Sequence, residues 1–407
     1  MNRWTLAARN LVRHRRRSVL TGAIVAFGFT ALTLAGGFMA QSFKGLREGA
    51  IRSGLGHIQF ADARSFDSTA TGTLAYPIRD AATFIATLAR DARVRAVMPR
   101  VEFFGLAGNG AASLPFMGVG VDPAAEAAGS DIPRTVVNGR WLHANERAAV
   151  LGAGLARALG VHTGDTLTLL ATTPAGSLNA LDVAVVGIAN IPVRALDDRY
   201  LATSVQTAGE LLDTPDTVTR VSVLLDRDGD EQRVATRLRE TLKERFPGIE
   251  TRRWDELAEF YAQVRVLYLG IFGFMGAVLV VVVFLAAFNA TLMSVAERTR
   301  EIGTLRAIGM RQRDIRHQFV REGALAGLTG SIAGALLTLL IMLGLNASGI
   351  MLPAPPGATR AIPLHIEFFP WAWLFAGAAM TATLAIAAWF PARRAARLPI
   401  VEALGHV

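Results

Sequence analysis

The stretch Leu267–Ala296, "LYLGIFGFMGAVLVVVVFLAAFNATLMSVA", contains no charged residue, whereas the next one, Glu297–Ile315, "ERTREIGTLRAIGMRQRDI", contains five arginines and three acids. A membrane core about 30 Å thick is crossed by a helix of roughly 20 apolar residues. The first stretch is therefore predicted to span a membrane. In the second, apolar residues recur at helical spacing beside Gly303 and Gly309. This pattern predicts a short amphipathic helix that ends near Gly309 and lies along the membrane face.

The chain contains three further apolar runs of similar length, so four membrane spans are predicted. Of the 407 residues, 52% are hydrophobic, which is too apolar a composition for an ordinary soluble protein. The first run follows the basic sequence "RHRRR", as a signal peptide would, but it is longer than the usual apolar core and lacks a good cleavage site. It is therefore expected to remain as a span. The four runs are Val19–Ala40, Leu267–Ala290, Leu325–Leu345 and Trp371–Phe390.

Arginines gather at one end of each predicted span. Met1–Arg17 holds six arginines and no acid, Ser294–Glu322 seven arginines and four acids, and Arg393–Val407 three arginines and one acid. Basic segments next to spans stay in the cytoplasm, which predicts cytoplasmic termini and an external loop of residues 41–266. The same arginines could suggest nucleic-acid binding, but their position against the spans argues against that partner.

The long external loop is predicted to fold as an α+β domain. "RVRAVMPRVEFFGLAG" and "SLPFMGVGVD" read as two strands around the turn dipeptide Asn109-Gly110. Residues 110–191 are interpreted as a β-rich insertion between outer elements. From Asp255 the pattern stays helical into the second span, which predicts one helix from the domain into the membrane; the alternative is a short loop before the span.

The residues that would support an enzyme are missing from this sequence. It has no cysteine, which excludes disulfides and thiolate metal sites. Its two lysines, Lys44 and Lys243, lie outside any phosphate-binding GxxxxGK[ST] loop. The seven histidines lack the spacing of a zinc site. We therefore expect no catalytic, metal or cofactor site in this chain.

"ERTREIGTLRAIGMRQRDI" before a span and "FPARRAARLPIVEAL" near the end resemble the FtsX/MacB-type permease family of ABC systems, which includes the lipoprotein-releasing permeases of the type VII class. "GHIQF", "LGVHTGDTLTLLA" and "VVGIANIPVRALDDRYLATSVQTAGELL" are similar to the external domain of that family. The resemblance implies an α-helical bacterial inner-membrane protein with four transmembrane helices and a large α+β periplasmic domain of the MacB type. MacB proper has a fused ATPase, whereas here the ATPase, with its ATP and Mg, is expected on another chain.

The resemblance also implies a dimer of four-span subunits, formed with a second permease copy or a paralogue, above cytoplasmic ABC ATPases. A coupling helix would contact the ATPase, and its residues, carried over one by one, are Glu297, Arg298, Glu301, Gly303, Leu305, Arg306 and Gly309. Separately, the third span has two pairs of small residues that permit close helix packing, in the chain or at a dimer face. They are Gly323/Gly327 and Gly330/Gly334.

These expectations give an order of segments along the chain. It is a cytoplasmic N-terminal helix (1–17), a first span (18–41), a periplasmic domain with stalk helices (42–265), a second span (266–291), a cytoplasmic loop with the coupling helix (294–322), a third span (323–346), a periplasmic loop (347–369), a fourth span (370–391) and a cytoplasmic tail (392–407).

The expected function is that of a permease subunit which uses mechanotransmission to extract or move a lipidated or amphipathic substrate on the periplasmic side. No ionisable residue lies within a predicted span, although pathways for polar solutes usually need one. The alternatives are a MacB-like efflux subunit with an adaptor and an outer-membrane channel, or an FtsX-like activator of a cell-wall hydrolase. Besides the ATPase and the lipid bilayer, a periplasmic carrier or adaptor is an expected partner.

Overall fold

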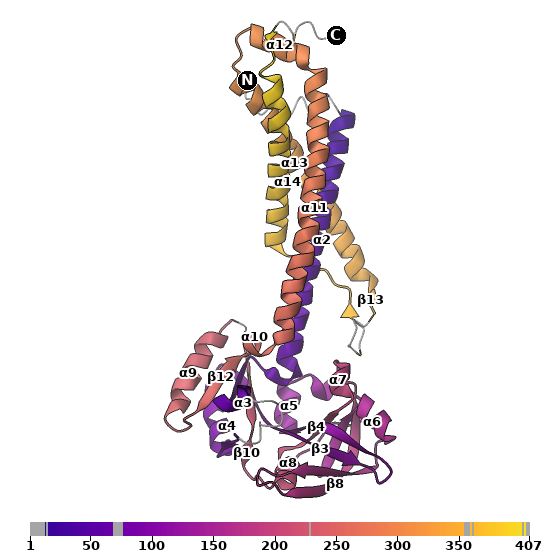
Figure 1. The fold of residues 1–407 in the computed structure, drawn as a ribbon, viewed down its shortest axis with the longest axis vertical. Coiled ribbons are helices and arrows are strands. Elements are labelled where there is room, and N and C mark those ends of the chain that lie inside the picture. Colours follow the sequence, from indigo (N-terminus) through magenta and orange to yellow (C-terminus); the bar gives the residue numbers. More distant parts are fainter. Residues whose placement is uncertain are drawn as a thin grey trace. The chain divides into compact units, whose positions relative to one another are not determined.

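The computed structural model describes residues 13, 15–67, 76–227, 229–353, 359, 362–400 and 403. The chain forms two compact units (Figure 1). The helical unit consists of Met1–Lys44, Val264–Met351 and Pro363–Val407, and the α+β unit consists of Gly45–Gln263 and Leu352–Ile362. The predicted N-terminal helix of residues 1–17 falls almost wholly outside the described residues.

Among the described residues, four helices are long and apolar enough to cross a membrane. This finding confirms the four predicted spans, although the helices continue beyond the apolar runs. They are α2 (Arg15–Ala50), α11 (Glu259–Glu297), α13 (Gln312–Ser348) and α14 (Pro370–Ala395). A short helix, α12 (Thr299–Ala307), connects α11 to α13.

Hydroxyl groups inside the helical unit bond between helices. The Oγ1 of Thr30 donates to the carbonyl of Gly334 (3.1 Å), and the Oγ1 atoms of Thr33 and Thr338 lie 3.0 Å apart. Water is absent from a membrane core, so polar groups there must find partners within the protein. These bonds join α2 to α13.

The four glycines of the third span lie at contacts within the chain. A Cβ atom on Gly327 would lie 2.7 Å from the Cα of Thr381 in α14, and one on Gly330 would lie 2.7 Å from the Cβ of Val25 in α2. Gly323 faces α14 and Gly334 faces α2 in the same way. Packing within the chain therefore accounts for all four, and a dimer face would use other surfaces of these helices.

The α+β unit is built on one ten-stranded sheet with the order β12-β1-β11-β3-β4-β9-β6-β8-β5, in which β7 pairs with β3 and β8. The strands are β1 (Ile58–Asp62), β3 (Val94–Gly108), β4 (Ser113–Val121), β5 (Val136–Gly139), β6 (Ala148–Gly152), β7 (Thr166–Thr172), β8 (Leu178–Ala189), β9 (Tyr200–Ser204), β11 (Arg220–Leu225) and β12 (Ile249–Arg253). The longer helices against it are α4 (Ala81–Ala89), α5 (Pro123–Gly129), α6 (Ala153–Leu159), α8 (Val205–Leu212) and α9 (Glu231–Lys243).

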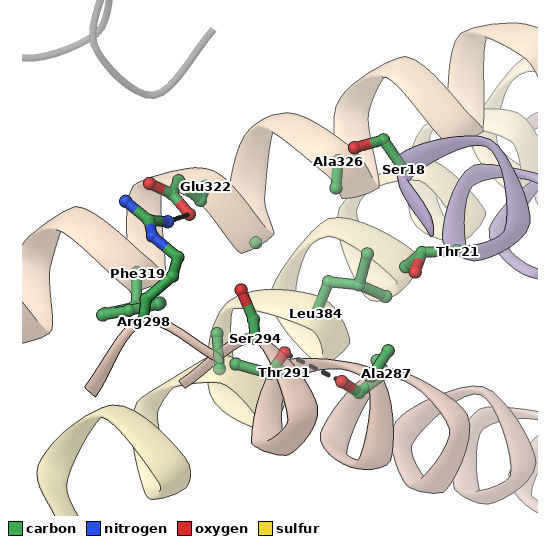
Figure 2. Close-up of a pocket in the computed structure, with 13 residues that line it drawn as sticks. Ser18, Thr21, Ala287, Thr291, Ser294, Arg298, Phe319, Glu322, Ala326 and Leu384 are labelled. Atoms are coloured by element: carbon green, nitrogen blue, oxygen red, sulfur yellow. Dashed lines mark hydrogen bonds and ion pairs between the residues drawn. The ribbon is translucent and has the colours of Figure 1, made fainter. Parts of the chain in front are cut away.

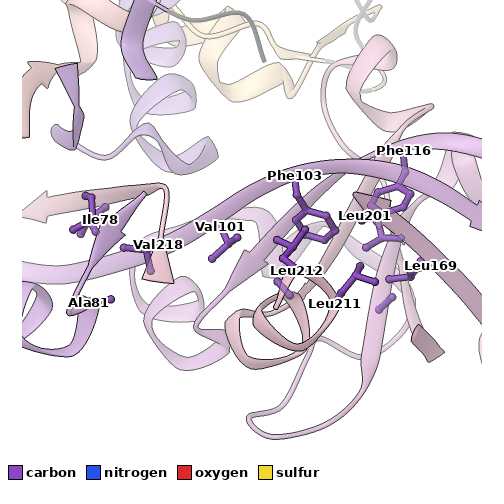
Figure 3. Packing of buried hydrophobic residues seen from close by; sticks show 14 of the residues in the cluster. Ile78, Ala81, Val101, Phe103, Phe116, Leu169, Leu201, Leu211, Leu212 and Val218 are labelled. Carbon is purple, nitrogen blue, oxygen red and sulfur yellow. The ribbon is translucent and has the colours of Figure 1, made fainter. Parts of the chain in front are cut away.

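The core of this unit is aromatic and aliphatic. Phe103 of β3 and Phe116 of β4 are buried and meet edge to face, with ring centroids 5.6 Å apart. Figure 3 shows these rings beside Leu211 and Leu212 of α8. The hairpin of β3 and β4 confirms the predicted turn at Asn109, whose Oδ1 accepts the backbone N–H of Ala111 and of Ala112.

The segment 110–191 is rich in strands, as predicted, but it shares the sheet with the rest of the unit. β9 follows this segment in sequence and pairs with β4 and β6, while β7 pairs with β3. The segment is therefore not a separate layer, and residue 191 is no boundary of the sheet.

Asp197 joins α6 to the loop that precedes α7 (Arg194–Asp197). Its carboxylate is buried and accepts backbone N–H groups from Ala153 (3.1 Å), Gly154 (2.8 Å) and Ile191 (2.9 Å). A carboxylate is favoured at a helix N-terminus, where N–H groups lack helical partners. Asp197 therefore has a structural role in this unit.

The helix predicted to run from the domain into the second span is present with one interruption. A short helix, α10 (Trp254–Leu257), ends at Ala258, which has φ −85° and ψ 67°, and α11 then continues from Glu259 to Glu297. The alternative of a loop before the span is wrong, because α11 begins before the apolar run.

Candidate functional site

The candidate site is α12 with the turns at its two ends. It begins after Arg298, which is not helical, and it ends at Ile308. Gly309 follows with φ +102°, a conformation that glycine adopts without strain. The structure thus confirms a short helix that ends near Gly309.

Arg298 fixes the start of α12 to α13. Its Nη1 lies 3.3 Å from the Oε2 of Glu322, its Nε lies 3.2 Å from the Oε2 of Glu301, and its guanidinium lies 5.5 Å from the ring centre of Phe319. The side chains of Arg298 and Glu322 are only 14% and 15% exposed. Figure 2 shows this pair beside Phe319. Three contacts from one guanidinium hold α12 in a defined direction.

One face of α12 packs against the ends of the long helices. Ile302 is buried in a cluster with Ile315 and Phe319 of α13 and with alanines at the end of α14. Arg306 donates from its Nη1 to the carbonyl of Leu398, just after α14. Gly303 is also buried. These residues position α12 and do not offer a surface to a partner.

The opposite side of α12 and the turn after it are exposed. Ile308 is 79% exposed and Met310 is 36% exposed, and both lie among the charged residues Arg300, Glu301 and Arg311. We call these five residues the α12 outer surface. It combines apolar and charged groups as protein-binding surfaces do.

The seven residues predicted from the family motif divide into two groups. Arg298, Gly303 and Arg306 hold α12 in place, whereas Glu301 and Gly309 are exposed. Glu297 is the exposed last residue of α11, and Leu305 is half-buried. The prediction omitted Ile308 and Met310 as site residues; the signal that could have found them is an apolar residue on each side of a glycine that ends a helix.

A small cavity of mixed polar and apolar lining lies next to Arg298, among all four long helices. It has a volume of about 90 Å³. That volume is well below the roughly 300–1,000 Å³ typical of pockets for drug-sized ligands. Its lining includes Ser18 and Thr21 of α2, Thr291 and Ser294 of α11, Glu322 of α13 and Leu384 of α14 (Figure 2).

In the described part of the chain, no group of three His, Asp or Glu side chains is arranged to hold a metal ion. The structure shows a short helix held in place by Arg298 and Ile302, followed by an exposed turn.

Two protein-family models match the chain. The FtsX-like permease C-terminal model matches residues 273–400 and includes α12, and the MacB-like periplasmic core domain model matches residues 18–241. The second match alone covers more than half of the chain.

Individual relatives match a shorter region. The macrolide export ATP-binding/permease protein MacB of Shigella sonnei (strain Ss046) is 42% identical over 118 residues, which is 29% of this chain and 16% of that protein. MacB of Escherichia coli (strain K12) is 41% identical over 118 residues, with the same coverage. The matched region thus spans about a sixth of the length of these relatives.

Two solved structures are similar to the chain at low sequence identity. The periplasmic region of MacB from Actinobacillus actinomycetemcomitans has a TM-score of 0.39 at 13% identity, covering 52% of this chain and 94% of that one. The extracellular domain of the ABC-type transporter YknZ from Gram-positive bacteria has a TM-score of 0.36 at 12% identity, covering 48% of this chain and 99% of that one.

Four membrane-length helices, an α+β unit between the first two, and matches to both family models agree with one another. Membership implies a multi-pass inner-membrane protein. The chain belongs to the FtsX/MacB-type family of ABC transporter permeases.

Proposed function

We propose that this chain is a permease subunit that works by mechanotransmission. A cytoplasmic ATPase, which binds ATP and Mg, docks on the α12 outer surface. Its closure moves α11 and α2, and these helices move the α+β unit on the periplasmic side. That movement extracts or displaces a lipidated or amphipathic substrate, such as a lipoprotein. A second permease copy or a paralogue completes the dimer.

The α12 outer surface is the observation that supports this proposal. Ile308 is 79% exposed beside the charged residues of α12, while the other face of the helix is fixed by Arg298 and Ile302. A rigidly held helix with an exposed apolar anchor and a charged rim suits a protein partner. A helix that only anchored to anionic lipid would not need Glu301 among its arginines, so the mixed charges favour a protein partner.

The interior of the helical unit supports a substrate that stays outside the helices. The centres of the spans contain no ionisable residue, and Thr30, Thr33 and Thr338 use their hydroxyl groups between helices. The cavity near Arg298, of about 90 Å³, is smaller than typical ligand pockets of roughly 300–1,000 Å³. A polar substrate that crosses the membrane would need a lined path.

The name of the MacB relatives favours a second candidate function, which is efflux with an adaptor and an outer-membrane channel. An FtsX-like activator of a cell-wall hydrolase is a third. In all three cases the basic segments at the span ends favour a cytoplasmic position for both termini and α12. A lipoprotein carrier, an adaptor or a hydrolase bound to the α+β unit would distinguish the three functions.

The test is purification of the tagged chain from its native host with its partners identified by mass spectrometry. We expect a P-loop ATPase whose activity the permease stimulates. Ile308→Asp should reduce ATPase binding at least about tenfold, because a charge replaces the apolar anchor. Leu178→Asp, at a residue 70% exposed in the α+β unit, is the matched control and should bind normally. Recovery of an intact chain without any ATPase would overturn the proposal.

The double variant Glu301→Ala/Arg306→Ala should insert into the membrane and lose the coupling between ATP hydrolysis and transport. Arg306 donates to the backbone after α14 and Glu301 accepts from Arg298, so the variant loosens α12 without touching a span. Failure of membrane insertion would favour a role in anchoring instead.

A further inference from the structure

The C-terminal end of α2 continues into one π-helical turn, Ile51–Leu55, which belongs to the α+β unit. Backbone carbonyl groups of this turn accept hydrogen bonds from side chains elsewhere in the α+β unit. Ser130 donates from its Oγ to the carbonyl of Arg52 (3.0 Å), and Ser222 donates from its Oγ to the carbonyl of Gly54 (2.7 Å). π-Helical turns are rare and occur often at functional positions.

A buried ion pair lies against this turn. Arg100 of β3 pairs with Glu126 of α5, and the two side chains are 12% and 2% exposed. Gly54 has φ +112°, and a Cβ atom there would collide with the guanidinium of Arg100. The guanidinium therefore occupies a notch that only glycine leaves open.

Stability alone does not explain a pair of charges at this position. The Nε of Arg100 and the Oε2 of Glu126 have no hydrogen-bond partner in the described part of the chain. Burial works against the charge of Arg100, yet neighbouring negative charge, above all that of Glu126, raises the pKa of its guanidinium. A buried ion pair is often no more stabilising than a well-packed apolar pair, so its value can lie in fixing one geometry.

The short helix α10, which precedes α11, joins the sheet at the same place. Trp254, the first residue of α10, belongs to a buried cluster with Ile51 of the π-helical turn and Met98 of β3. The guanidinium of Arg47 in α2 lies 5.6 Å from the ring centre of Trp254. Met98 precedes Arg100 by two residues on β3, so the π-helical turn and α10 both contact one short part of this strand.

We infer that Arg100 and Glu126 are positioning residues that fix the C-terminal end of α2 to β3, so that movement of the helix reaches the sheet and is not absorbed in the π-helical turn. This inference rests on the proposed function, since it assigns the point at which force enters the α+β unit. The sheet can follow the helix only when the turn between them is rigid.

The absence of cysteine from the chain permits a direct test by spin labelling. Glu48→Cys, on an exposed position of α2, and Ala111→Cys, on the exposed tip of the β3–β4 hairpin, receive the labels in the full chain in nanodiscs. Pulsed electron paramagnetic resonance then gives the distribution of distances between them. The test variant is Arg100→Met/Glu126→Leu, which fills the space with apolar groups. The control is Arg140→Met/Glu146→Leu, at a pair 2.8 Å apart elsewhere in the same unit.

Without nucleotide, the distance distribution should broaden about twofold in the test variant, because the turn can then sample other conformations. It should keep its width in the control. An unchanged width in the test variant would overturn the inference. If that variant does not fold, Glu126→Gln, which keeps the shape of the side chain, replaces it under the same criterion.

A second arm adds the ATPase and a non-hydrolysable nucleotide. In the otherwise unchanged chain, the mean distance between the two labels should change when the nucleotide is added. This change should be lost in Arg100→Met/Glu126→Leu. No such change in the otherwise unchanged chain would count against mechanotransmission, whereas the width measured without nucleotide still decides the inference about the ion pair.

Discussion

The strongest quantitative prediction concerns the pair of Arg298 and Glu322 behind α12. Two unit charges 3.3 Å apart attract by about 5 kcal/mol at an effective dielectric constant of about 20. Loss of hydration and of side-chain freedom removes most of this attraction, which leaves a net contribution of about 1–2 kcal/mol for a pair this deeply placed. Because every 1.4 kcal/mol is a factor of ten, Arg298→Ala should weaken ATPase binding by about 5- to 30-fold.

The assay is a double-mutant cycle on the dissociation constant of the ATPase, measured with the permease in nanodiscs. Glu322 is 15% exposed on α13, where it pairs with Arg298 and also lies 3.5 Å from the Nε2 of Gln318, so its main effect on binding should pass through Arg298 and the direction of α12. Glu322→Gln should therefore weaken binding too, and Arg298→Ala/Glu322→Gln should cost little more than Arg298→Ala alone.

The control uses Arg300, an exposed residue of α12. Arg300→Ala and Glu322→Gln should have additive effects, because one would remove a direct contact and the other the orientation of the helix. The reasoning is refuted if Glu322→Gln binds like the unchanged chain, or if the effects of Arg298→Ala and Glu322→Gln simply add.

Three further predictions concern the two units. Gly334→Leu should lower the thermal stability of the purified protein by about 2 kcal/mol or more through overpacking against α2, whereas Gly344→Leu on the open side of the same helix should change it little. Asp197→Ala should destabilise the α+β unit by about 2–4 kcal/mol in chemical denaturation, because three backbone N–H groups lose their acceptor, and Asp198→Asn at the exposed neighbour should be nearly neutral. The hydrogen bond from Arg140 holds the pKa of Glu146 below its usual value of 4.5. The ionised Glu146 therefore adds its full contribution to the free energy of unfolding above pH 4.5, and this contribution is lost as the pH drops through the lowered pKa. Glu146→Gln should therefore flatten the acid side of the stability profile, and an unchanged profile would contradict this.

The membrane helices could be predicted because length and absence of charge are local properties of the sequence. The turn at Asn109 could be predicted for the same reason, because the side chain of Asn109 bonds to the backbone only two and three residues later. The position of β9 in the sheet could not be predicted in this way. It pairs in parallel with β4, about 80 residues earlier, and such a pairing depends on contacts that no short pattern records.

The family motif located the candidate site, but the sequence did not show which of its residues face a partner. Ile302 and Ile308 appear in one apolar series, yet a six-residue separation turns an α-helix by about 240°. The helix also ends between them, so Ile302 is buried and Ile308 exposed. Similarly, the glycines of the third span predicted close packing, but only the structure shows that their neighbours are α2 and α14 of the same chain.

The length of α11 has a mechanical consequence. Its 39 residues make a rod of about 58 Å, nearly twice the thickness of a membrane core. A tilt of 10° about one end would displace the other end by about 10 Å, which is close to the diameter of a helix. An angular change too small to break any contact at α12 could thus become a large translation next to Ala258, with no change in backbone conformation along the way.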